Sequence, residues 1–250
     1  MVTTNMASID LLAAIDLRGG RVVRLREGDF ERETAYSDDP AATAAALAGQ
    51  GVRWLHVVDL DGARAGRAVQ ADAISGIVDA VSGRAAVEVG GGIRETETAR
   101  RWIEGGVARV VIGTAALRSP GFAAEIVEAF GQERVVVAID IRAGRVVGDA
   151  WQRAGHTSDL ETMMAELWQR GVRTFEVTAI DRDGSLAGPD VELLGRVRAI
   201  LPSASIIASG GIRSIDDLQA VRGLGCSGAI VGRAIHEGTL SVTEALAALA

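Results

Sequence analysis

The sequence predicts an α/β fold, a (β/α)8 TIM barrel built from two duplicated half-barrels, and three observations support this. Short apolar runs rich in Val and Ile alternate with longer segments of helical period. Within each run the apolar residues are continuous, as in parallel strands that are covered on both faces. Eight such units fit into 250 residues, and motifs of the first half return in the second. The alternative, an open doubly wound sheet, accounts less well for two evenly matched halves.

The predicted strands are residues 11–16, 54–60, 86–90, 109–113, 135–140, 174–179, 205–209 and 228–232. The predicted helices lie near residues 40–50, 70–82, 96–105, 120–130, 159–170, 190–200, 215–224 and 241–249. A hairpin-like stretch from Arg21 to Arg26 follows the first strand, and we expect a polar loop up to residue 38 to cover the functional face. We expect one domain over residues 1–250, with half-barrels at about 8–130 and 131–250.

The internal repeat has three clear parts. The stretch from Ala14 to Val23 returns, 124 residues later, from Ala138 to Val147. A Gly-Gly-Ile-Arg turn and a Gly-containing turn one strand later also recur, each 119 residues on; they are Gly91 to Arg94 and Ile112 to Ala115, then Gly210 to Arg213 and Val231 to Ala234. We also match Asp61-Gly62 with Asp183-Gly184.

Composition restricts the function. With a hydrophobic content of 48% and a net charge of -7, the chain has no sequence-wide basic surface for nucleic acid. It has no apolar run of membrane-spanning length and no signal peptide, so we expect a cytoplasmic monomer with a small-molecule partner. The single cysteine, Cys226, is expected to be a small buried residue. All 26 cationic residues are arginine, and this excludes chemistry that needs a lysine amine, such as Schiff-base catalysis.

Asp16 and Asp140 each end an apolar run, at predicted strands one and five, which face each other across an eight-stranded ring. A carboxylate in such a place is costly to desolvate unless it is paired or functional. Each could be a structural acid that caps a turn or pairs with an arginine. The matched pair favours catalysis, with one acid as general base and the other as general acid. A metal site is the weaker alternative, because the motif brings no histidine, and we expect none.

Two pairs of glycine turns follow strands three and four and strands seven and eight. Glycine lets the backbone approach an anion closely, although most single glycine turns are only turns. The recurrence favours two phosphate sites and hence a substrate with a phosphate at each end. The residues are Gly91, Gly92, Arg94, Gly113 and Thr114 in the first half and Ser209, Gly210, Gly211, Gly232 and Arg233 in the second.

Other candidates are less specific. Thr178 ends strand six and is as well explained by the preference of threonine for strands. Asp183 precedes a glycine, as in an ordinary turn. Trp151 could stack on a heterocycle or cover the core. For His56 we identify no partner.

Together these motifs resemble the histidine-biosynthesis isomerase family that acts on the bisphosphorylated formimino aminoimidazole carboxamide ribotide. The resemblance covers residues 11–240. It rests on Ala14-Ile15-Asp16-Leu17, Arg24-Leu25-Arg26-Glu27-Gly28-Asp29-Phe30, Val58-Asp59-Leu60-Asp61-Gly62-Ala63, Val89-Gly90-Gly91-Gly92-Ile93-Arg94, Ala208-Ser209-Gly210-Gly211-Ile212 and Ile230-Val231-Gly232-Arg233-Ala234.

The resemblance implies a barrel that catalyses an Amadori rearrangement of an aminoaldose to an aminoketose without metal or organic cofactor. It implies that Asp16 is the general base and Asp140 the general acid. Thr178 then matches an active-site position, and Asp183 a position near the reacting ribose. Arg26 and Gly28, in the loop motif after strand one, are implied as substrate-binding residues.

The chain departs from the family after strand five, where Ala150-Trp151-Gln152-Arg153 replaces Gly-Trp-x-Glu. Three alternatives stay open. The segment around Asp183 resembles the sister cyclase, whose lysine after strand one is absent here. Glu33-Thr34-Ala35-Tyr36 resembles a bifunctional form that also isomerises phosphoribosylanthranilate, although that form has serine in place of Gly90. A non-catalytic phosphate-binding barrel is the alternative from another class.

Overall fold

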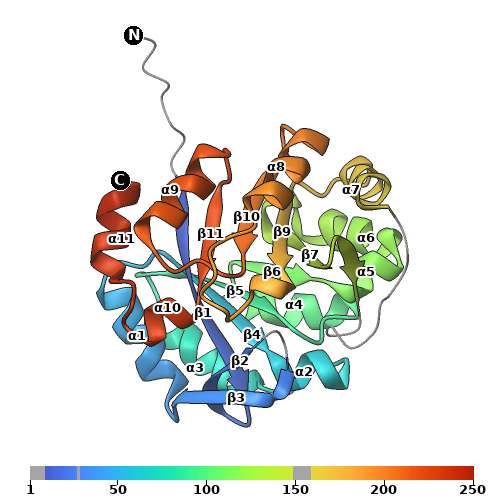
Figure 1. Cartoon of the computed structure of the whole chain (residues 1–250). Helices are drawn as coiled ribbons and strands as arrows, with labels where there is room; N and C mark the ends of the chain where they lie inside the picture. Colours follow the sequence, from blue (N-terminus) through green and yellow to red (C-terminus); the bar gives the residue numbers. More distant parts are fainter. Residues whose placement is uncertain (1–8, 27–28, 149–158) are drawn as a thin grey trace.

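A closed ring of eight parallel strands forms the centre of the molecule, with helices around it (Figure 1). This computed structural model describes residues 9–26, 29–148 and 159–250, and of Arg26 only the backbone. In order around the ring, the strands are β1 (Asp10–Arg18), β4 (Trp54–Asp59), β5 (Ala86–Gly90), β6 (Arg109–Ile112), β7 (Val135–Arg142), β9 (Thr174–Ala179), β10 (Ser205–Ser209) and β11 (Gly228–Val231). Parallel pairing of β11 with β1 closes the ring. The predicted (β/α)8 barrel is confirmed.

Eight helices match those predicted from the helical period of the sequence. They are α1 (Pro40–Gly49), α3 (Ala71–Val81), α4 (Thr96–Glu104), α6 (Pro120–Phe130), α7 (Leu160–Gln169), α8 (Val191–Ile200), α9 (Ile215–Gly223) and α11 (Val242–Leu249). Shorter helical segments, which sequence analysis does not predict, are α2 (Leu60–Ala65), α5 (Thr114–Arg118), α10 (Arg233–His236), η1 (Gln132–Arg134) and η3 (Ile180–Arg182). Segments this short carry no recognisable period.

Each half of the barrel begins with a strand that turns back on itself. In the first half, β2 (Arg21–Arg26) pairs antiparallel with β1 and with β3 (Asp29–Ser37). In the second, β8 (Arg145–Val147) pairs antiparallel with β7. The prediction of a polar loop up to residue 38 is therefore wrong. Most of β3 is exposed, so it has no apolar alternation to reveal it, and its pairing with β2 alone makes it a strand.

The apolar core has two parts. The larger part fills the space between the strands and the helices. The smaller part lies inside the ring and consists of Leu12, Ala14, Val111, Val136, Ile207 and Ile230. Val111 and Ile230 of this inner cluster also line the pocket, which lies toward the carboxyl ends of the strands. Cys226 is buried, as predicted. Among the residues with described structure, no helix has the length and hydropathy to cross a membrane.

The two back-turning strands are held by equivalent hydrogen bonds. The backbone N–H of Gly19 donates to Asp61 Oδ2 at 2.8 Å, and that of Ala143 donates to Asp181 Oδ2 at 2.7 Å. Asp181, and not Asp183, thus occupies the place of Asp61 in the second half. The proposed match of Asp61 with Asp183 is therefore wrong. Strand register pairs Ala14 with His56 and Ala138 with Glu176, so His56 and Glu176 are equivalent and the offset between the halves here is 120 residues (176 minus 56). The same offset leads from Asp61 to Asp181.

Ala143 has a φ of 47°, whereas Gly19 in the first half has 56°. A left-handed conformation costs a residue with a Cβ about 1–2 kcal/mol, and replacement by glycine removes this cost. Glycine also gives the unfolded chain more conformational entropy, and this partly offsets the gain. We therefore expect Ala143→Gly to raise the free energy of unfolding in urea by up to about 1 kcal/mol. Gly144→Ala, at a φ of 74°, should lower it. An unchanged or lower stability for Ala143→Gly would contradict the assigned strain.

Candidate active site

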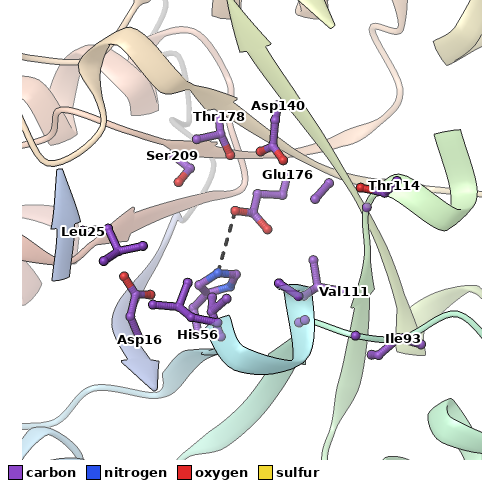
Figure 2. Close-up of a pocket in the computed structure, with 18 of the residues that line it drawn as sticks. Asp16, Leu25, His56, Ile93, Val111, Thr114, Asp140, Glu176, Thr178 and Ser209 are labelled. Carbon is purple, nitrogen blue, oxygen red and sulfur yellow. Dashed lines mark ion pairs between the residues drawn. The ribbon is translucent and has the colours of Figure 1, made fainter. Parts of the chain in front are cut away.

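One pocket at the carboxyl ends of the strands gathers most of the predicted site residues (Figure 2). Those of the predicted set that line it are Asp16, Asp140, Thr178, Asp183, Gly91, Gly92, Arg94, Gly113, Thr114 and Ser209. Residues from both halves thus meet in one cavity, although they lie up to 193 positions apart, between Asp16 and Ser209. The pocket carries three carboxyl groups of the predicted set and its three hydroxyl groups, those of Thr114, Thr178 and Ser209.

A second, smaller pocket adjoins the first on the side of β10 and β11. It is lined by the remaining predicted residues, Gly210, Gly211, Gly232 and Arg233, together with Ser209 and Asp183, which face both pockets. In the ring, β10 and β11 lie opposite β5 and β6, which carry the first glycine turns. The two candidate anion sites therefore lie across the barrel from each other. Gly28, Trp151 and the side chain of Arg26 are outside the described residues.

Arg24 joins two of the acids and is absent from the predicted set. From β2 it makes an ion pair with Asp16 at 2.8 Å and a second, direct one with Asp183. All three side chains are largely buried. Burial lowers the pKa of Arg24, but Asp183 and Asp16 together raise it above its ordinary value. The guanidinium therefore stays charged and holds Asp16 of the first half close to Asp183 of the second.

The carboxyl group of Asp183 holds its proton more strongly than an ordinary aspartate. Burial raises its pKa, Arg24 lowers it, and the nearby charges of Asp16 and Asp140 raise it further, to about 6. A carboxyl group that titrates near neutrality can donate a proton under working conditions. Asp183 thus belongs among the candidate acids.

Asp140, Thr178 and Ser209 form one row across three adjacent strands. Strand register pairs Asp140 with Thr178 and Thr178 with Ser209. Thr178 is 3% exposed, and Asp140 is only partly buried. Figure 2 shows this row on one side of the pocket and Asp16 on the other. The space between them is where both aspartates could reach one ligand.

A charged cluster below this row was missed by sequence analysis. His56 Nδ1 lies 2.6 Å from Glu88 Oε1, and its Nε2 lies 3.8 Å from Glu176 Oε1. Arg109 pairs with the other oxygen of Glu88. Burial lowers the pKa of His56, but Glu176 and Glu88 raise it to about 9. A titratable residue inside a largely apolar run was the available signal, since β4 contains His56 and β9 contains Glu176.

The glycines after β5 and β10 have a backbone reason to be glycine. A Cβ on Gly91 would lie 2.2 Å from the Asp59 carbonyl oxygen, and one on Gly210 would lie 2.7 Å from that of Ala179. Both glycines have positive φ. Gly113 and Gly232 differ, because a Cβ there would meet only side-chain and backbone atoms at 3.3 Å or more. Close packing against the backbone therefore accounts for the first glycine of each site, whereas at Gly232 a Cβ would press on the Arg24 guanidinium at 3.3 Å.

Arg94 and Arg233 supply positive charge at the two candidate anion sites. The Arg94 guanidinium lies over Gly66, where a Cβ would come within 2.6 Å of it. Arg233 pairs with Glu237 at 2.8 Å and donates to the Gly184 carbonyl at 2.8 Å. Across the described ranges, no three His, Cys, Asp or Glu side chains are grouped as a metal ion would require.

The fold and site define a class, that of (β/α)8 barrels whose pocket joins paired acids to two glycine-rich turns. The family model described as a histidine biosynthesis protein matches residues 10–241. The chain belongs to this histidine biosynthesis family.

Curated relatives cover nearly the whole chain. One from Thermomicrobium roseum is 48% identical over 229 residues, which are 91% of this chain and 92% of the relative. Another from Desulforudis audaxviator is 44% identical over 240 residues, 95% and 90% of the two chains. A third, from Geobacillus thermodenitrificans, is 41% identical over 249 residues, 98% and 99%. Each is named 1-(5-phosphoribosyl)-5-((5-phosphoribosylamino)methylideneamino) imidazole-4-carboxamide isomerase.

The His56 cluster predicts how stability depends on pH. Because folding raises the pKa of His56 from 6.5 to about 9, its contribution is complete below 6.5 and is lost as the pH rises through 9. We expect the free energy of unfolding to fall by roughly 2 kcal/mol between pH 7 and pH 9. His56→Asn should be less stable at pH 7 and should lose most of this dependence.

His236→Asn is the matched control. It also removes an imidazole that contacts the barrel, since His236 Nε2 lies 2.7 Å from the Ala14 carbonyl oxygen. This variant should keep the pH dependence of the parent protein in urea unfolding. The same slope in His56→Asn as in the parent would contradict a charged His56.

Proposed function

We propose that this protein is a cofactor-independent aldose–ketose isomerase that converts the bisphosphorylated formimino aminoimidazole carboxamide ribotide to its phosphoribulosyl form. The observation that carries the proposal is the placement of Asp16 and Asp140 across one pocket whose ends carry the two glycine-turn sites. The names of relatives that are 41% to 48% identical over nearly their whole length support it.

In the proposed reaction, an acid protonates the ribose ring oxygen, and the ring opens to a Schiff base. Asp16 then takes the proton from C2 of the sugar to give an enolamine. Tautomerisation, in which C1 gains a proton and the C2 hydroxyl loses one, gives the ketose. Asp16 suits the base because Arg24 pairs with its carboxylate at 2.8 Å. An ion pair of this kind fixes the position of the carboxylate from which a general base acts.

We assign the acid to Asp140, on the opposite wall from Asp16. Asp183 is a second donor to test, since it has its pKa raised to about 6 and faces the same pocket. The two differ in placement: Asp183 is held by Arg24, whereas Asp140 lies in the row with Thr178. Thr178 donates or accepts a hydrogen bond beside Asp140 in this proposal, and so orients the reacting sugar.

The substrate's two phosphates would bind at the two glycine-turn sites. Backbone N–H groups and arginine charge suit a phosphate dianion. Arg94 serves the site on β5 and β6, and Arg233 the site on β10 and β11. The two sites lie across the barrel from each other, as the proposed substrate with a phosphate at each end would require. Cofactor independence, activity in the cytoplasm and a monomeric state are parts of this proposal.

Replacing either aspartate should slow the chemical step. We expect Asp16→Asn and Asp140→Asn each to lower kcat by at least about 100-fold with a smaller change in KM, because general acid–base catalysis contributes about 10²–10⁴-fold. Asp183→Asn in the same series tests the second donor. The measurement is a steady-state assay with the ribotide.

Asp10→Asn is the control for this series. Asp10 starts the same strand as Asp16 and pairs with Arg53 at the far end of the barrel. It should keep the parent kcat. Near-normal turnover in Asp16→Asn would overturn the base assignment, and an inactive parent protein would favour the non-catalytic barrel.

A parallel assay with phosphoribosylanthranilate separates single from dual specificity. That substrate has one phosphate, so it could occupy only one of the two glycine-turn sites. We expect turnover of the ribotide alone. Comparable turnover of both would establish the bifunctional form.

A further inference from the structure

The floor of the pocket is formed by two side chains that occupy equivalent places in the two half-barrels. Strand register pairs Ala14 with His56 in the first half and Ala138 with Glu176 in the second. The alanines leave room inside the ring, and His56 and Glu176 fill it from opposite sides. Their side chains meet at 3.8 Å. Figure 2 shows the pair in the centre of the pocket, with Asp16 to one side and Asp140 to the other.

Glu176 is built into the site that the proposed reaction uses. It lies two positions before Thr178 on β9, so its Cα is roughly 7 Å deeper along the strand. Its side chain lines the main pocket together with Asp140 and Thr178. Burial raises the pKa of Glu176, His56 lowers it, and the nearby charges of Glu88 and Asp140 raise it further, to about 7. A ligand held between the two aspartates would therefore rest on Glu176.

The Glu176 carboxyl group lacks a full set of partners. It is 6% exposed, and its contact with His56 is longer than a hydrogen bond. Within the part of the chain that the structure describes, no donor lies within hydrogen-bond distance of it. A buried carboxylate normally accepts several hydrogen bonds, and an unfilled one in a pocket is ready to accept them from a ligand.

Glu88 shows the contrast. It belongs to the same buried cluster, but both of its oxygens are occupied, one by His56 and one by Arg109. Glu88 does not line the pocket. The cluster therefore contains one acid with a structural role, Glu88, and one acid that faces the pocket, Glu176.

We propose that Glu176 is a specificity-determining residue whose carboxylate binds the hydroxyl groups of a phosphorylated sugar on the floor of the pocket. This rests on the proposed function for the position of the sugar, and it names a recognition contact that the paired aspartates and glycine turns do not provide. Two neighbouring hydroxyls can donate to the two oxygens of one carboxylate, and such charge-assisted bonds are strong and directional. His56 keeps the carboxylate in place from the other side.

The test is isothermal calorimetry with ribose 5-phosphate and, separately, inorganic phosphate. The parent protein should bind ribose 5-phosphate more tightly than phosphate. Glu176→Leu removes the acceptor and should lower affinity for ribose 5-phosphate by at least tenfold, with less than a twofold change for phosphate. Glu176→Gln keeps one acceptor oxygen, so its affinity for ribose 5-phosphate should lie between those of the parent protein and Glu176→Leu. In the ribotide assay, Glu176→Leu should raise KM while kcat stays within threefold.

Glu88→Gln is the matched control, because it removes a carboxylate from the same cluster without altering the pocket lining. This variant should have lower thermal stability, but its affinities for ribose 5-phosphate and for inorganic phosphate should each change by less than twofold. Parent-like binding of ribose 5-phosphate by Glu176→Leu would overturn the proposal, as would a parent protein that binds the sugar phosphate no better than phosphate. Absence of ribotide turnover would instead contradict the proposed function alone, because the calorimetry needs no catalysis.

Discussion

The parallel pairing of β1 with β11 is the contact on which the rest of the structure depends. Residues from Asp10 to Ala13 pair with Gly228 to Val231, and this joins the first strand to the last. Gly228 allows the close approach, since a Cβ there would lie 2.9 Å from Leu12 Cδ1. Closure leaves the barrel without an open edge and brings all eight carboxyl ends to one rim. Without it, the acids of the two halves would face different surfaces.

Within this symmetric ring, the site is asymmetric. The turns after β1 and β7 are held by matching aspartates, Asp61 and Asp181, and their purpose is structural. Asp183 has no such counterpart. Arg24, which reaches Asp183 from β2, also pairs with Asp16 and so connects an acid of each half. The Arg24 bridge therefore gives Asp16 and Asp183 a shared partner within a duplicated scaffold.

The interior of the barrel contains buried charged side chains beneath the rim. Below the rim, His56 lies between Glu88 and Glu176, while the next layer down is apolar, with Leu12, Val136 and Ile207. Buried charges of this kind are costly unless paired, so their presence beneath the pocket is a sign of use rather than of stability. In the proposal made above, the polar floor of the site serves ligand recognition, and an apolar cluster lies beneath it.

The sequence by itself determined the barrel and much of the rim. Apolar runs and helical periods located eight strands and eight helices, because each such element buries a face of its own, and the repeat located Asp16, Asp140 and the glycine turns. Tertiary structure alone decided the rest. Strand β3 exists only through its pairing with β2, and Arg24 meets Asp183 across 159 residues of chain. His56 meets Glu88 on the neighbouring strand β5 and Glu176 on β9 across the ring. Such partners depend on distances in space that spacing along the chain does not reveal.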